Sequence, residues 1–180
     1  MPATHTRARG TALRLTLAVA MCSAGSAGAS DDATPAQFGE SEKTFIDQVA
    51  AQDLAEIELS RLLQHKSSSK ALRRLAHAVL ADDTANYEQL FQLCLRRHYP
   101  IAPQLDERHR KLLQQVRAAR SPAALGRKYI DTLLVDQAGM DALLVTLAAQ
   151  GPAGDIEQFA SDTAQMSARH ERMARALASK

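Results

Sequence analysis

Apolar residues return every three or four positions along four long segments of this 180-residue chain. This is the period of an α-helix with one buried face. In the first segment the stripe consists of Phe45, Val49, Leu59 and Leu63. No stretch alternates with the period of two that a half-buried strand requires, and β-branched residues are sparse beside alanine and leucine. The chain is therefore predicted to be all-α.

Turn and capping residues divide the chain into helices expected over residues 41–65, 70–98, 106–120, 121–150 and 155–178. Ser41 and Ser121 are candidate N-caps, and Asp155 with Gln158 has the spacing of a capping box. Prolines and glycines follow the second and fourth segments, where helices commonly stop. We expect one domain over 41–178, an up-down four-helix bundle with one extra short helix.

The N-terminus has the order of a secretory signal peptide. Arg7, Arg9 and Arg14 precede a short apolar stretch, and small residues follow up to Ala29. The apolar stretch is shorter than the roughly 20 residues of a membrane span. We expect residues 1–29 to be a signal peptide cleaved after Ala29, and the polar residues 30–40 to be a flexible leader. The protein is then periplasmic or secreted.

Cys22 allows a second interpretation, a lipoprotein that is anchored through this residue, although Met21 before it is bulkier than usual. Cleavage after Ala29 leaves Cys94 as the one cysteine, so no intramolecular disulfide is expected. The remaining chain has 19 basic and 20 acidic residues, a net charge of −1. This balance argues against a nucleic-acid partner, and a membrane is expected as a partner only if Cys22 is lipidated.

One polar residue lies in the middle of each long apolar stripe: Glu56, Asp83, Gln137 and His170. At about 100° per residue, Glu56 falls within the stripe of its helix, and Asp83 lies close to Leu72 and Leu90. Their distances from the turns place them at similar depths. A shared polar layer inside the bundle is expected.

This layer has two interpretations. It is a structural layer that sets helix register, a role for which the Gln137 amide is well suited, or it holds a divalent metal ion through Glu56, Asp83 and His170. The first interpretation requires no cofactor. Tyr87 and Tyr129 are expected to hydrogen-bond to polar atoms of the layer.

Residues 41–178 resemble the bacterial domain-of-unknown-function family 4142. The matching stretches are QDLAEIELSRLL, LRRLAHAVLADDTANYEQL, RKYIDTLLVDQAGMDALL and FASDTAQMSARHERMARAL. The resemblance implies an exported protein with a ferritin-like four-helix arrangement, and it implies no activity.

Three positions depart from the family pattern. Asp82-Asp83 stands where the second helix usually reads Asp-His, Leu125-Gly126 replaces Phe-Asp, and Gln137 replaces a histidine. Glu56, Asp82 and His170 keep metal-capable side chains. A site that depends on the missing histidines is therefore altered in this chain.

Motifs of phosphate loops, nucleophile elbows and paired Glu-x-x-His di-iron sites are absent from the sequence. We therefore expect a non-enzymatic protein with an envelope or stress-related role that binds an unknown protein partner. The alternatives are a metal-binding protein with a reduced site and a carrier of an apolar ligand between the helices.

Overall fold

The computed structural model describes residues 37–151 and 154–179, and this part of the chain contains five helices and no strand. The helices are α1 (Glu40–Lys66), α2 (Lys70–Arg96), α3 (Glu107–Arg117), α4 (Pro122–Ala149) and α5 (Asp155–Ala178). The all-α prediction is confirmed, and the expected helix ends lie within three residues of these bounds. The expected signal peptide, Cys22 and most of the expected leader lie outside the described residues.

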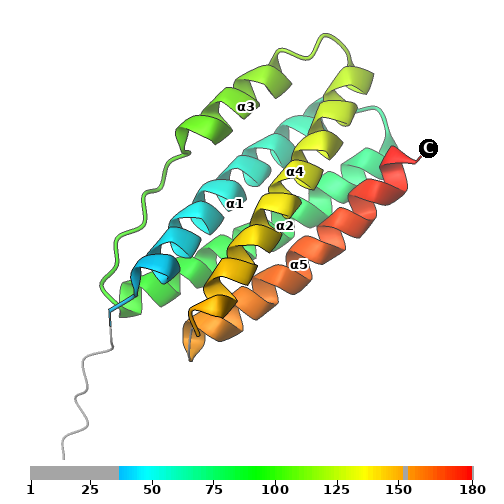
Figure 1. Ribbon diagram of the computed structural model, residues 1–180. Helices are drawn as coiled ribbons and strands as arrows, with labels where there is room; N and C mark the ends of the chain where they lie inside the picture. Colours follow the sequence, from blue (N-terminus) through cyan, green and yellow to red (C-terminus); the bar gives the residue numbers. More distant parts are fainter. Residues whose placement is uncertain (1–36, 152–153, 180) are drawn as a thin grey trace, which may run out of the picture. The chain divides into compact units, whose positions relative to one another are not determined.

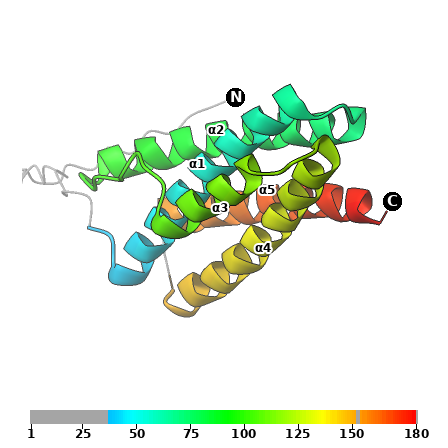
Figure 2. The ribbon, with the colours of Figure 1, turned by 90° about the horizontal axis from the view of Figure 1, so that it is seen from above.

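Two antiparallel hairpins form the bundle (Figure 1). α1 packs against α2, α4 packs against α5, and contacts of α1 with α4 and of α2 with α5 close the four-helix arrangement. The short α3 lies over α1 and α4, as the second view shows (Figure 2). α1 and α4 therefore each bury a wider face than a simple four-helix bundle requires.

Three helices begin at capping residues that the sequence contains at the expected turns. The side chains of Ser69, Asp106 and Ser121 accept hydrogen bonds from backbone N–H groups three residues further on. Each bond satisfies one N–H that has no partner within the helix. Pro122 follows Ser121 at the first position of α4, where its fixed φ suits a helix.

Two caps differ from the expectation. α1 begins after Gly39, whose N–H donates to Glu42 Oε2 at 2.8 Å, so Ser41 is already inside the helix. α5 begins after Gly154, whose φ of 72° suits a glycine. Asp155 is therefore the first helical residue, and its carboxylate forms an ion pair with Arg97. The capping box is not formed, and Gln158 Nε2 donates to Asp162 Oδ1 at 2.9 Å instead.

The last residues of the expected leader belong to the packed domain. Phe38 is buried, its ring contacts Tyr99 edge-on, and the guanidinium of Arg97 lies 4.7 Å above its centre. Tyr99 in turn donates to Asp47 Oδ2 at 3.0 Å. The chain is thus fixed against α1 and the α2–α3 connection from Phe38 onward.

The apolar core consists of two clusters at opposite ends of the bundle. The first lies near the start of α1 and includes Phe45, Val49, Leu90, Met140 and Phe159, together with the buried thiol of Cys94. The second lies near the end of α1 and includes Leu63, Leu75, Leu113, Leu133 and Ala174. Between them the helices bury polar side chains, so the polar layer divides the core.

α4 is long and apolar enough, by composition, to be a candidate membrane span. In the bundle it buries Leu133, Met140 and Leu147, and also the polar residues Asp136 and Gln137. Its exposed side includes Val135 and Val145. α4 is therefore a bundle helix whose apolar buried face is interrupted by polar residues near its middle.

Candidate metal centre

The layer between the two apolar clusters is built from all four long helices. Each helix buries at least two polar side chains at about its middle, and each of these residues is exposed by 5 % or less. The members are Asp53 and Glu56 on α1, Asp83 and Asn86 on α2, Asp136 and Gln137 on α4, and Thr163, Ser167 and His170 on α5.

The structure brings Glu56, Asp83 and His170 together. One ligand atom from each residue lies within 4.8 Å of the corresponding atoms of the other two, and all three residues are buried. These are the three residues for which the sequence suggested a metal site. They come from α1, α2 and α5, so the group forms only when both hairpins are assembled.

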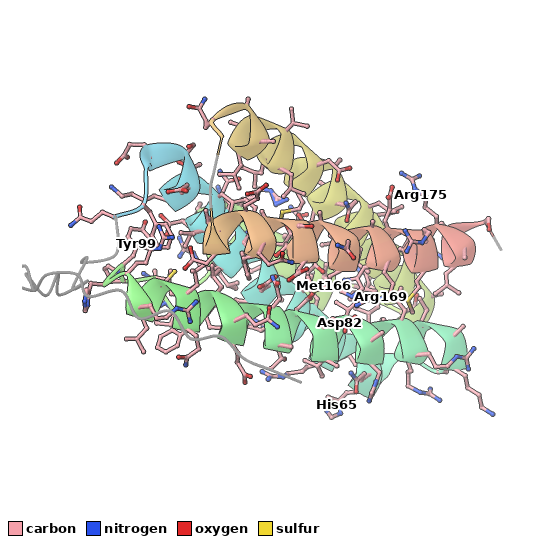
Figure 3. The ribbon with its side chains drawn as sticks, turned by 90° about the horizontal axis from the view of Figure 1, so that it is seen from below. His65, Asp82, Tyr99, Met166, Arg169 and Arg175 are labelled. Atoms are coloured by element: carbon pink, nitrogen blue, oxygen red, sulfur yellow. The ribbon has the colours of Figure 1, made fainter. Side chains whose placement is uncertain are left out.

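His170 is held between two consecutive carboxylates of α2. Its Nε2 lies 2.9 Å from Asp82 Oδ2, and its Nδ1 lies 3.7 Å from Asp83 Oδ1. Asp82 is partly exposed and also accepts a hydrogen bond from Arg169 at 2.7 Å. Figure 3 shows Asp82 of α2 and Arg169 of α5 pointing toward each other, beside Met166.

The two carboxyls of the group are protonated more readily than usual. Burial, followed by the nearby charge of Asp136, raises the pKa of Glu56 to about 8. Burial and the charges of Glu56 and Asp53 raise the pKa of Asp83 well above its ordinary value. Burial also lowers the pKa of His170, which favours the neutral imidazole, the form that binds metals. In contrast, the hydrogen bonds from Arg169 and His170 outweigh burial and lower the pKa of Asp82.

Asp83 also has an unsatisfied atom. Its Oδ2 is buried and has no hydrogen-bond partner among the described residues, and the same holds for Oδ2 of Asp136. Buried carboxylate oxygens without a partner are costly and uncommon in folded proteins. A proton or a cation at Asp83 Oδ2 would remove this cost.

A second hydrogen-bonded group lies beside the first. Thr163 donates to Asn86 Oδ1 at 3.0 Å, and Asn86 donates through Nδ2 to Asp53 Oδ2 at 2.9 Å. Burial raises the pKa of Asp53 well above its ordinary value, although the Asn86 bond opposes the shift. This chain links α5, α2 and α1 across the bundle.

α3 supplies a positive charge to the layer. Arg108 binds the fully buried Asp136 of α4, with Nη1 at 2.8 Å from Oδ1, while its own side chain is half exposed. His109 is buried next to it, with Nε2 at 3.8 Å from the same Oδ1. His109 lies near the start of α3, on the side of this helix that packs against the bundle.

Gln137 is buried, as expected, but outside the three-residue group. Its Oε1 accepts a hydrogen bond from Ser167, and its Nε2 donates to Asp141 Oδ1 at 2.9 Å. It therefore joins α4 to α5. Tyr129 is also buried and shares a hydrogen bond of 2.7 Å with Ser60, whereas Tyr87 is partly exposed.

Sequence reasoning missed Asp53, Asn86, Asp136 and Arg108. The first three lie within one helical turn of the predicted polar residues Glu56, Asp83 and Gln137. A wider buried face on each helix would have included them. Arg108 gave no signal in the sequence, because only the packing of α3 against α4 brings it to Asp136.

Two carboxylates and one imidazole form a donor set for divalent first-row metals such as zinc, manganese or iron. In a tetrahedral zinc site with bonds of about 2.0 Å, neighbouring ligand atoms lie about 3.3 Å apart. The widest pair here would have to close by at most about 1.5 Å, which side-chain rotations can supply. Asp82 has the position of the carboxylate that commonly orients a ligating histidine.

Comparisons with known proteins agree with the fold. Among solved structures, a DUF305 fragment from Deinococcus radiodurans is similar, with a TM-score of 0.69 and 12% identity over 79% of this chain and 97% of that chain. At this identity the likeness concerns the fold alone. No curated protein matches this chain. The domain of unknown function DUF4142 matches residues 27–177, so the resemblance inferred from the sequence is confirmed and the chain belongs to the DUF4142 family.

Proposed function

We propose that this protein binds a divalent transition metal ion in the interior of its helical bundle. The ligands are Glu56, Asp83 and His170, and the proposal rests on the proximity of their ligand atoms, within 4.8 Å of one another in a buried layer. Among the expectations from the sequence, the metal-binding alternative thus gains most from the geometry.

Charge balance supports this function. Glu56 and Asp83 together carry two negative charges when ionised, and an interior of low polarity disfavours both. A divalent cation neutralises the pair completely, whereas protons do so only below the raised pKa values of the two carboxyls. The unpartnered Oδ2 of Asp83 gives the cation a free oxygen.

The role is binding rather than catalysis. A catalytic metal needs an open coordination position that a substrate can reach, whereas the three ligands here are buried by 96 % or more. A partly exposed hollow beside Asp82, Met166 and Arg169 lies outside His170 and offers a route for the ion. Export to the envelope and a protein partner that gives or takes the metal remain part of this proposal.

The first test is metal analysis of protein purified from its native compartment without a histidine tag. We expect close to one zinc, manganese or iron per chain. The apo-protein is then titrated with Zn²⁺, Mn²⁺ and Co²⁺. At a free metal concentration of about 100 times Kd, the domain gains about 2.7 kcal/mol, or about 5–10 °C in Tm.

His170→Ala and Asp83→Asn should each abolish this increment. His77→Ala is the matched control, because His77 is an exposed histidine on α2; it should keep the full increment. Metal-free native protein together with a Tm that no metal raises would overturn the proposal. An increment that survives in His170→Ala would place the metal elsewhere.

A further inference from the structure

The fold gathers positive charges at one end of the bundle. The α1–α2 turn, the α3–α4 turn and the end of α5 lie at the same end (Figure 1). Lys66 and Arg120 line one hollow there, and a side chain at Gly126 of α4 would touch Leu72 of α2. We define the basic end by six exposed residues from these segments: Lys66, Lys70, Arg74, Arg120, Arg127 and Arg172. In Figure 3, His65 and Arg175 mark this end and Tyr99 marks the other.

The six cations of the basic end are unpaired. Within the described part of the chain, none of their side chains takes part in an ion pair or a hydrogen bond. In contrast, two nearby cations have partners. Arg117 forms an ion pair with Glu58, and Arg73 donates a hydrogen bond to the backbone carbonyl of Ser67. The basic end therefore carries positive charge that no acidic side chain of the described residues neutralises.

Helix stability explains the placement of Lys66, in the last turn of α1, but not that of the cations on α2 and α4. Cations are favourable at helix C-termini and unfavourable at N-termini. Lys70 is the first residue of α2, and the first turns of α2 and α4 contain no acid. α1 and α5 follow the usual rule at the opposite end, with Glu40, Glu42, Asp155 and Glu157 in their first turns. The near-neutral net charge of the chain hides this separation of charge.

We propose that the basic end docks on the phosphate-rich surface of an anionic lipid bilayer. The cations come from the turns and the adjoining helix ends at one end of the bundle, where a flat anionic surface can approach several of them together. The exposed large apolar residues of the described chain, Phe91, Leu95, Val135 and Val145, lie on α2 and α4 away from these turns. Docking is therefore electrostatic and needs no insertion, in the manner of basic segments next to membranes.

This attachment differs from the one that the sequence suggested, where a membrane was a partner only through a lipidated Cys22. A nucleic acid is the competing polyanion. Among the described residues, no aromatic side chain is exposed at this end for stacking on bases. We therefore favour the bilayer and treat the duplex as an outcome of the test.

The test uses the full chain with a chelator present, so that it is independent of the metal site. Co-sedimentation is measured with vesicles of phosphatidylcholine and with vesicles of equal parts phosphatidylcholine and phosphatidylglycerol. The wild-type protein should bind the anionic vesicles more tightly, and this preference should vanish at high salt, because the Debye length falls to about 3 Å at 1 M.

The test variant is Lys70→Gln/Arg74→Gln/Arg127→Gln, which should lose on the order of tenfold or more of the preference for anionic vesicles. Lys43→Gln/Arg96→Gln/Lys111→Gln changes the net charge equally elsewhere and should keep the preference within about twofold. Residues 1–29 are common to all three proteins, and thermal unfolding shows whether each is folded. Equal preferences in the three proteins, or a loss confined to binding of a DNA duplex, would overturn the proposal.

Discussion

The Nε2 atom of His170 lies 2.9 Å from the Oδ2 atom of Asp82. Because Asp82 is on α2 and His170 is on α5, this contact fixes the imidazole ring against the facing helix. With Nε2 as the donor, Nδ1 keeps its lone pair and faces Asp83. A metal-ligating histidine is commonly oriented by an outer carboxylate in this way.

Replacing Asp82 should therefore weaken metal binding without removing a ligand. We expect Asp82→Asn to lower the affinity for Zn²⁺ by about 10–100-fold, the usual effect of losing such an outer carboxylate. Isothermal titration of the apo-protein measures this. Glu88→Gln, an exposed acid on the same helix, should leave the affinity unchanged, and an equal effect of both substitutions would contradict the role of Asp82.

The stability of the apo-protein should fall as the pH rises. Folding raises the pKa of Glu56 from 4.5 to about 8, so between these values the folded state binds a proton that the unfolded state has released. Each such proton makes the free energy of unfolding fall by about 1.4 kcal/mol per pH unit. Below pH 4.5 this stabilisation is complete, and above pH 8 it is lost.

Urea unfolding in the presence of a chelator measures this slope. Glu56→Gln should reduce it by up to about 1.4 kcal/mol per pH unit, and Glu88→Gln should not change it. A saturating metal ion should reverse the dependence, because the ligands must lose their protons to bind it. A wild-type slope that Glu56→Gln leaves intact would assign the titration to other groups.

The hydrogen-bonded chain through Asn86 should contribute to stability independently of metal. Asn86→Ala leaves both Asp53 Oδ2 and the Thr163 hydroxyl without their partners in the interior. We expect a loss of about 2–3 kcal/mol, against about 1 kcal/mol for Thr163→Val, which removes one bond. Urea unfolding at constant pH measures both. Thr146→Val, at an exposed position, should stay within about 0.5 kcal/mol.

The helical period was sufficient to predict the helices and the depth of the polar layer. Glu56, Asp83, Gln137 and His170 are all buried, because a residue in the middle of an apolar stripe follows its neighbours inward. The hydrogen-bond and ion-pair partners of these residues could not be predicted from the sequence. Which nitrogen of His170 faces which carboxylate depends on how the two hairpins pack, and one sequence does not contain that register.

The packing of the short helix was the larger omission. A helix was expected over residues 106–120, but its sequence gave no reason to bury a residue on the outer side of α1 or α4. Its packing on both helices creates a second buried face, where Asp136 meets Arg108. The basic end escaped prediction for a related reason, since its residues are far apart in the sequence and only the turns bring them together.

Two glycines of α4 should respond differently to alanine. Gly139 is exposed with nothing within 4 Å of an added Cβ, so Gly139→Ala should stabilise by about 0.5–1 kcal/mol through helix propensity. At Gly126 the added Cβ would lie 2.5 Å from Leu72 Cδ1. Leu72 must move, so Gly126→Ala should gain less or lose stability. Thermal unfolding compares the two, and an equal gain at both positions would show that Leu72 moves freely.

Arg108 should matter because it is the countercharge of a buried acid. Arg108→Met leaves Asp136 fully buried without its guanidinium partner. Breaking a buried pair typically costs about 3–5 kcal/mol, and the half-exposed Arg108 side chain reduces this expectation to about 2 kcal/mol. Because a neutral amide needs no countercharge, Arg108→Met/Asp136→Asn should regain most of the loss. Urea unfolding of both single variants and the double variant measures this coupling, with Arg110→Met on the exposed side of α3 as the control. Additive losses in the double variant would mean that the two side chains act separately.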